Sequence, residues 1–246
     1  MADWNDTRQQ TGFSSVPRAG DAVARRATYD MGLRAHMLKI YNYMTSGVLL
    51  TGIVALVAAN SGFTASMAGS PLMWLIVLSP LAIVFAMSFG ANRFSTTTLQ
   101  AMFWGFATLM GLSLSTVFLV YTGESIAATF FATAGAFAGL SLYGYTTKKD
   151  LSGFGTFLVM GVVGLLIAMV LNIFLQSSAL GLAISFLGVL IFAGLTAYDT
   201  QRLKEQYAML RGSEFAGKAV VLGALTLYLD FINMFQFLLS FMGNRE

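Results

Sequence analysis

The chain has 246 residues, of which 57% are hydrophobic and only 10% are charged. Because a soluble domain carries about 25% charged residues, this composition excludes an ordinary soluble fold and predicts a protein that lies in a lipid bilayer. The absence of cysteine excludes disulfides, thiolate metal sites and a cysteine nucleophile, and the small net charge of +3 is spread over loops. We therefore expect no cofactor and no nucleic-acid partner.

The first 37 residues are polar and charged, and they precede the first apolar segment. This stretch is too long for the n-region of a signal peptide, and the apolar segment after it is long enough to cross a bilayer. We therefore expect an uncleaved first helix, preceded by a disordered cytoplasmic tail over residues 1–37.

Seven apolar segments, bounded by polar residues, glycine or proline, follow the tail. Each has about the 20 residues that a membrane-spanning helix needs. The expected spans are 38–60, 72–91, 98–121, 125–146, 155–175, 179–199 and 219–242. The predicted fold class is an all-α integral membrane protein. It has one domain of seven transmembrane helices over residues 38–242 and a short non-cytoplasmic C-terminus over residues 243–246.

The basic residues predict which way the helices cross the membrane. Thirteen of the 14 lysine and arginine residues fall in the tail or in loops on one face, and only Arg245 falls on the other. By the positive-inside rule, the N-terminus is cytoplasmic and the C-terminus is outside. The longest connection, residues 200–218, lies on the cytoplasmic side and carries charges of both signs. We expect a short surface helix there.

Glycine residues in the fourth expected span predict close helix packing. Gly135 and Gly139 are four residues apart, so they lie on one face of the helix expected over 125–146. Small residues at this spacing let two membrane helices approach each other closely. We expect this face to pack against another helix of the bundle.

Two acidic residues fall within the expected spans, whereas the other nine lie in the tail, the loops or the C-terminus. Asp199 ends the sixth span, and Asp230 lies about 18 Å into the seventh, near the middle of the bilayer. A carboxylate at that depth costs at least about 2.5 kcal/mol, so it should face the bundle interior and have a partner. Both residues are therefore functional candidates. The alternative is a buried, hydrogen-bonded pair that only holds the bundle together.

Other polar residues extend the two aspartates into stripes along their helices. Thr226 and Asn233 lie on the same face of the last span as Asp230, and Thr196 lies one turn before Asp199. A narrow polar stripe on an otherwise apolar helix indicates that other helices surround it. We therefore expect the last helix to be central in the bundle.

If the two stripes meet, Asp199 and Asp230 form a coupled carboxyl pair. Two adjacent carboxylates cannot both ionise cheaply in a low dielectric, so they would share a proton and sense pH. Arg93, at the cytoplasmic end of the second span, is the cation best placed to bind them.

Four motifs at or near these positions resemble the Bax inhibitor family, the transmembrane Bax inhibitor motif proteins, and in particular its bacterial members. They are residues 148–152 (Lys-Lys-Asp-Leu-Ser), 172–174 (Asn-Ile-Phe), 197–201 (Ala-Tyr-Asp-Thr-Gln) and 225–233 (Leu-Thr-Leu-Tyr-Leu-Asp-Phe-Ile-Asn). The last string is highly specific, and the resemblance covers residues from about 34 to 242. It implies a multi-pass protein of the cell inner membrane whose last helix is ringed by the other six.

The resemblance also implies a function. The family is associated with a calcium leak that responds to pH and, in its eukaryotic members, with suppression of stress-induced death. Its paired aspartates fall on Asp199 and Asp230, and its helix-2 arginine, proposed to latch the pair, falls on Arg93. We therefore expect a calcium leak channel, not an enzyme, with the two aspartates along the calcium pathway. Carboxylates suit this hard cation, which prefers oxygen ligands.

Two other functions are alternatives to the leak. One is a non-transporting regulator of stress or cell death, or of a membrane-bound protease, because some bacterial relatives restrain such a protease. The other is an intramembrane aspartyl protease, since Tyr198-Asp199 fits the first motif of those enzymes. Its second motif fails, because residues 227–230 read Leu-Tyr-Leu-Asp instead of Gly-x-Gly-Asp.

Overall fold

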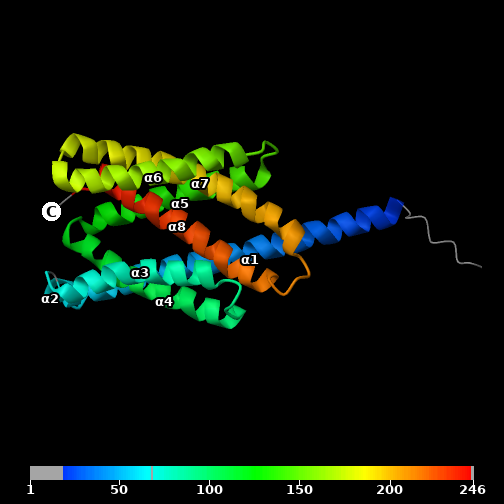
Figure 1. The fold of residues 1–246 in the computed structure, drawn as a ribbon, viewed down its shortest axis with the longest axis horizontal. Coiled ribbons are helices and arrows are strands. Elements are labelled where there is room, and N and C mark those ends of the chain that lie inside the picture. Colours follow the sequence, from blue (N-terminus) through cyan, green and yellow to red (C-terminus); the bar gives the residue numbers. More distant parts are fainter. Residues whose placement is uncertain (1–18, 68, 245–246) are drawn as a thin grey trace, which may run out of the picture. The chain divides into compact units, whose positions relative to one another are not determined.

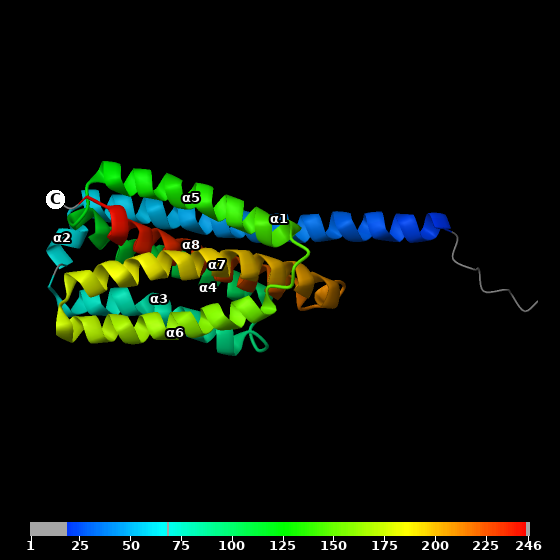
Figure 2. The same ribbon diagram turned by 90° about the horizontal axis from the view of Figure 1, so that it is seen from above.

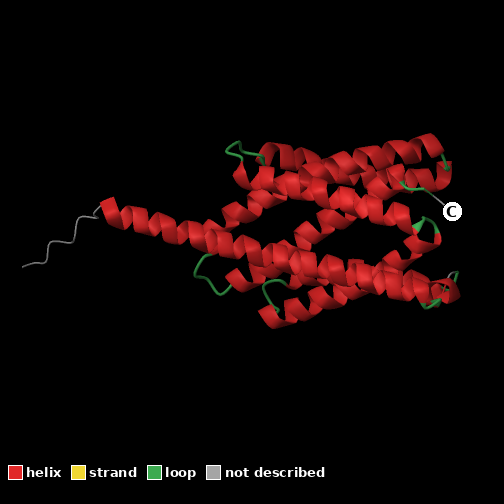
Figure 3. Cartoon of the chain, turned by 180° about the vertical axis from the view of Figure 1, so that it is seen from behind, coloured by secondary structure: helices red, strands yellow, loops and turns green. Residues whose placement is uncertain are grey.

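The computed structural model describes residues 19–67 and 69–244 (Figure 1). In chain order its elements are α1 (Ala19–Asn60), α2 (Phe63–Met67), α3 (Pro71–Gly90), α4 (Thr96–Leu114), the 3-10 helix η1 (Ser115–Leu119), α5 (Gly123–Thr146), α6 (Ser152–Leu175), α7 (Ser178–Leu210) and α8 (Ala216–Met242). Every regular element in the described ranges is a helix, and short loops connect them (Figure 3). The all-α prediction is confirmed.

The chain divides into two compact units, residues 1–35 and 36–246. Of the first unit, the structure describes residues from 19 on, which form the N-terminal part of α1. Helix therefore covers residues that we expected in a disordered tail, and the rest of that tail, residues 1–18, lies outside the described residues. The second unit contains all the predicted site residues.

Within residues 19–67 and 69–244, seven helices are long and apolar enough to cross a membrane, as predicted. They are Ala27–Asn60, Pro71–Gly90, Thr96–Leu119, Gly123–Thr146, Ser152–Leu175, Ser178–Leu210 and Ala216–Met242. Most of their ends agree with the expected spans to within a few residues, because polar residues and turns bound each apolar run. The orientation predicted from the basic residues stays a prediction.

α7 continues well past its expected end at Asp199 and stops at Leu210. Residues 200–210 are rich in strong helix formers and contain no glycine or proline, so nothing interrupts the helix. α7 ends just before Gly212, whose φ of 78° is a conformation that suits glycine. The surface helix expected in this connection is thus the last part of α7, and Asp199 lies inside a helix.

α8 is the most buried of the seven spans. In its most apolar stretch 67% of the residues are buried, against 11 to 33% in the other spans. Tyr228 packs edge-on against Phe103 and Phe106 of α4, and Phe231 packs in the same way against Phe137 of α5. α8 runs between α7 and the part of α1 that belongs to the second unit (Figures 1 and 2). A complete ring of six helices around it stays a prediction.

Close contact between helices occurs at a glycine other than those we singled out. A Cβ atom on Gly144 of α5 would collide with the backbone carbonyl of Ala197 in α7, so only glycine fits there. A Cβ atom on Gly135 or Gly139 would meet no atom within 4 Å. The prediction of close packing at Gly135 and Gly139 is therefore wrong. Their spacing is suitable, but no neighbouring backbone approaches that face of α5.

The variant Gly144→Ala is expected to lower the free energy of unfolding by about 1–3 kcal/mol, because the added methyl forces α5 away from α7. Thermal unfolding of the purified protein in detergent measures this loss. Gly139→Ala is the matched control, since it makes the same change in the same helix where there is room for it. Equal unfolding temperatures for the two variants would contradict the close contact at Gly144.

Candidate functional site

The two intramembrane aspartates lie together between α7 and α8. Asp199 is 7% exposed and Asp230 is 4% exposed, and the two carboxyl groups lie close enough to interact with each other electrostatically. An ionised carboxylate only accepts hydrogen bonds, so a bond between two carboxyls requires a proton on one of them. The two polar stripes therefore meet at these carboxyls, and sharing of a proton by the pair stays a prediction.

One oxygen of this pair has no partner in the described protein. Asp230 Oδ2 is buried and accepts no hydrogen bond from any described residue. The large majority of buried side-chain polar atoms in native proteins are paired, and an unpaired one is costly.

The cation beside the pair in the structure is Arg202. Its Nη1 lies 3.8 Å from Asp199 Oδ1, one turn further along α7, and its side chain is 58% exposed. An ion pair this exposed contributes at most about 1 kcal/mol to stability. Arg202 was not among the predicted site residues, because the predicted helix ended at Asp199 and only a continuous helix places positions 199 and 202 on one face.

Arg93, which we predicted as the partner of the aspartates, lies elsewhere in the structure. It occupies the turn between α3 and α4, and its side chain is exposed. Among the described residues, the ion pair made by the aspartates is the one with Arg202. A role of Arg93 as a latch stays a prediction.

The supporting residues Thr196, Thr226 and Asn233 each donate a hydrogen bond within their own helix. Each bond goes to the carbonyl four residues earlier, at distances of 2.8, 3.1 and 2.8 Å respectively. The two hydroxyl donors and one amide N–H of Asn233 are therefore satisfied without the aspartates, and the three side-chain oxygens remain available as acceptors. We find that Thr196 is fully buried, whereas Thr226 and Asn233 line pockets.

A pocket of about 350 Å³ lies beside Asp199, between the last part of α7 and the first turns of α8. We call it the Asp199 pocket. Its polar lining residues are Asp199, Arg202, Gln206 and Thr226, and the others are apolar or glycine. By the positive-inside prediction this end of α7 and α8 faces the cytoplasm. The pocket would then lead from the cytoplasmic surface to the aspartate pair.

Gln201 fixes the α5–α6 loop to α7. Its Nε2 donates to the carbonyl of Lys149 at 2.7 Å, and its Oε1 accepts from the N–H of Leu151 at 2.9 Å. Two of the motifs noted in the sequence, 148–152 and 197–201, thus meet through one side chain. The contact holds in place the turn of α7 that follows the buried aspartate.

Gln201→Leu is expected to lower the free energy of unfolding by about 1–3 kcal/mol, because it leaves two loop backbone groups without their partner. Thermal unfolding in detergent checks this. Gln206→Leu is the control on the same helix, since its side chain makes no hydrogen bond to a described residue. If both variants unfold at the same temperature, Gln201 does not hold the loop.

Most of the chain matches one known protein family. The model of the family described as inhibitor of apoptosis-promoting Bax1 matches residues 33–246, most of the chain. The chain belongs to the Bax inhibitor family. Several members resemble it over nearly their whole length. Inner membrane protein YbhL of Escherichia coli is 45% identical over 234 residues, which are 94% of this chain and 98% of that protein.

Two further bacterial proteins are similar to the chain over most of their length. An uncharacterised protein of Caulobacter vibrioides is 50% identical over 232 residues, 88% of this chain and 92% of its own. One of Deinococcus radiodurans is 41% identical over 226 residues, 92% of this chain and 96% of its own. With seven helices able to cross a membrane, the chain is a multi-pass inner-membrane protein of this family.

Proposed function

We propose that this member of the Bax inhibitor family is a pH-sensitive calcium leak channel that is gated by the Asp199–Asp230 pair. The observation that carries the proposal is a pair of buried, interacting carboxyl groups on two adjacent membrane-spanning helices, placed beside a pocket. Ionisable groups inside a membrane domain usually mark ion pathways, because their cost is otherwise hard to explain.

Protonation of the pair is coupled to the packing of α7 against α8. With one shared proton, the pair carries a single negative charge and a hydrogen bond joins the two helices. Loss of this proton leaves two negative charges in contact, which repel each other. A second proton removes the charge on Asp199 and with it the ion pair to Arg202. Either change alters the force between α7 and α8.

Calcium is the cation that the pair is best suited to pass. It prefers oxygen ligands, and the pair offers carboxylate oxygens with hydroxyl and amide oxygens nearby on α8. No cluster of three or more His, Cys, Asp or Glu side chains occurs within the part of the chain that the structure describes. A site with few charged ligands binds calcium weakly, and weak binding suits a site that calcium passes through better than one that stores it.

Two other titratable groups near these helices need controls. Asp150, in the α5–α6 loop, is fully exposed, and hydrogen bonds from Ser152 lower its pKa, so it stays ionised near neutral pH. His36, the only histidine of the chain, is 9% exposed and packs against Tyr207 of α7, with 5.2 Å between ring centroids. Because histidine is the usual sensor near neutral pH, its contribution has to be measured separately.

Calcium uptake into liposomes that contain the purified protein tests the proposal. We expect faster uptake than in protein-free liposomes, and a rate that changes between acidic and neutral pH. His36→Gln is expected to keep this pH response. Uptake no faster than in protein-free liposomes would contradict the leak. Co-purification of a membrane-bound protease with such an inactive protein would support the regulator instead.

A further inference from the structure

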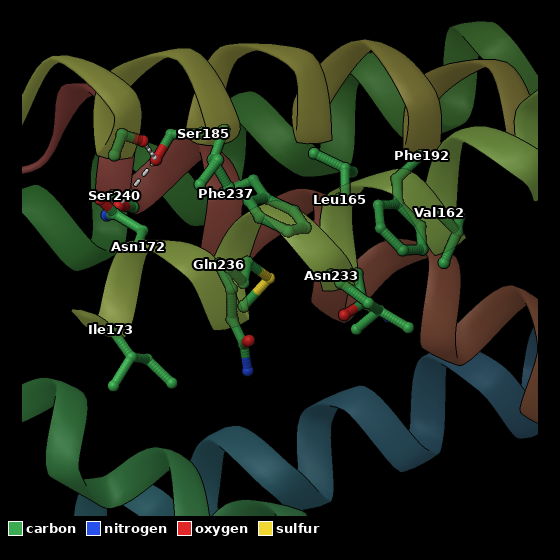
Figure 4. Close-up of a pocket in the computed structure, with 14 residues that line it drawn as sticks. Val162, Leu165, Asn172, Ile173, Ser185, Phe192, Asn233, Gln236, Phe237 and Ser240 are labelled. Atoms are coloured by element: carbon green, nitrogen blue, oxygen red, sulfur yellow. Dashed lines mark hydrogen bonds between the residues drawn. The ribbon is translucent and has the colours of Figure 1, made fainter. Parts of the chain in front are cut away.

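A second pocket, of about 490 Å³, lies between α6, α7 and α8 (Figure 4). We call it the α6–α8 pocket. Its polar lining residues are Asn172, Ser185, Asn233, Gln236 and Ser240, and the remaining ones are apolar or glycine. These five side chains lie in the half of the membrane domain near the α6–α7 turn, opposite the Asp199 pocket. A polar lining at this depth is unusual for a surface that faces lipid.

The polar side chains of this pocket come from all three helices that line it. Ser185 Oγ lies 3.0 Å from Ser240 Oγ and forms a hydrogen bond that links α7 to α8 (Figure 4). Asn172 Oδ1 accepts the N–H of Ser177, in the α6–α7 turn, at 3.1 Å. Gln236 is exposed although it lies within α8. Water or a hydrated cation, but not lipid, satisfies such an amide.

α8 connects the two pockets through the aspartate pair. Thr226 lines the Asp199 pocket, and Asn233 and Gln236 line the α6–α8 pocket. Asp230 lies between them on the same helix, and Asn233 follows it by three residues, or about 4.5 Å along the axis. Ser240 continues the row toward the end of α8. The polar row on α8 therefore passes from one pocket to the other through Asp230.

Two aromatic rings lie between the aspartate pair and most of this pocket. Phe192 of α7 and Phe237 of α8 stack with 5.8 Å between centroids and 22° between their planes, and both line the pocket (Figure 4). Each is seven residues, or about 10.5 Å, from the aspartate on its own helix. The ring of Phe237 lies against Gly188, where a Cβ atom would come within 2.5 Å of it.

We propose that the α6–α8 pocket is the non-cytoplasmic vestibule of the cation path, that it holds a hydrated divalent cation, and that the Phe192–Phe237 stack closes it toward the aspartate pair. The inference rests on the proposed leak function and names the second half of its path. Apolar constrictions of this kind stop ions because water leaves them readily. Amide and hydroxyl oxygens without a carboxylate bind calcium weakly, as a vestibule requires.

Cysteine labelling tests the vestibule without depending on flux, because the chain has no cysteine of its own. We expect Gln236→Cys and Ser240→Cys to react with a membrane-impermeant thiosulfonate added on the non-cytoplasmic side. Ile167→Cys is the control, since Ile167 is 58% exposed, lies within its helix at a depth similar to that of Gln236 and does not line the pocket.

The pocket variants should react at least about tenfold faster than the control, since the reactive thiolate forms in water but not against lipid. Added calcium should slow their reaction. Rates equal to that of Ile167→Cys would show that lipid or protein fills the pocket and would overturn the vestibule, whatever the leak assay gives. An unslowed reaction in calcium would overturn the cation site.

Calcium uptake by Phe237→Ala tests the closing stack. We expect uptake at least about fivefold faster than wild type at the pH where the wild-type leak is slowest, since a removed barrier of about 1 kcal/mol has this effect. Phe174→Ala is the control, because it removes the same ring from a site that is 80% exposed. Equal rates for the two variants, with a measurable wild-type leak, would overturn the stack while leaving the proposed function intact.

Discussion

Replacing Tyr228 by alanine is expected to lower the free energy of unfolding by about 3–5 kcal/mol, because it opens a large cavity beside α8, the most buried span. Tyr228 is completely buried, and its ring packs edge-on against Phe103 and Phe106. Its hydroxyl lies 2.6 Å from Thr51 Oγ1 and forms a hydrogen bond that joins α8 to α1. Thermal unfolding of the purified variant in detergent measures the loss.

Tyr228→Phe separates the packing of the ring from the hydrogen bond. It removes only the hydroxyl, and Thr51 keeps its bond to the carbonyl of Ala107 at 2.8 Å. We expect this variant to lose about 1 kcal/mol, the usual net value of one hydrogen bond. If the alanine variant is no less stable than the phenylalanine variant, the ring does not hold α8 against α4.

Asp230→Asn is expected to remove most of the pH response of the calcium leak. Asparagine keeps the size and a hydrogen-bond donor for Asp199, but it cannot lose or gain the shared proton. The ratio of uptake rates between acidic and neutral pH should fall at least about fivefold, the lower end of typical coupling between two sites. Liposome uptake at both pH values gives this ratio.

Asp150→Asn is the matched control for this variant. It makes the same substitution at a fully exposed carboxyl in the α5–α6 loop, outside the membrane-spanning helices. We expect it to leave the ratio of uptake rates unchanged. An equal loss of pH response in both variants would mean that the general charge of the protein, rather than the buried pair, sets the response.

Most of the fold follows from simple patterns in the sequence. Each span is a long apolar run with polar ends, and the bilayer allows such a run little other structure. Asp199 and Asp230 could be singled out because charge is rare and costly in these runs. Their meeting could be expected only as a possibility, since helix periodicity fixes the face of a residue on its own helix but not which faces of two helices pack together.

The remaining features depend on contacts that no periodicity encodes. Arg202 became a partner of Asp199 only because α7 continues through residues 200–210, a charged stretch that resembles a loop in hydropathy but has helix-forming residues. Gly144 and Gly139 look alike in sequence, yet only the first faces a neighbouring backbone. Gln236 likewise could not be singled out from the sequence, because its importance depends on the pocket that it lines.

The central claim is that the protonation state of the Asp199–Asp230 pair controls the calcium leak. Calcium uptake into liposomes, measured across a series of pH values for wild type and for Asp199→Asn/Asp230→Asn, tests it most directly. We expect the wild-type rate to change at least about fivefold over the series and the rate of the double variant to stay constant. A folded double variant whose rate follows the same pH curve as wild type would contradict the claim.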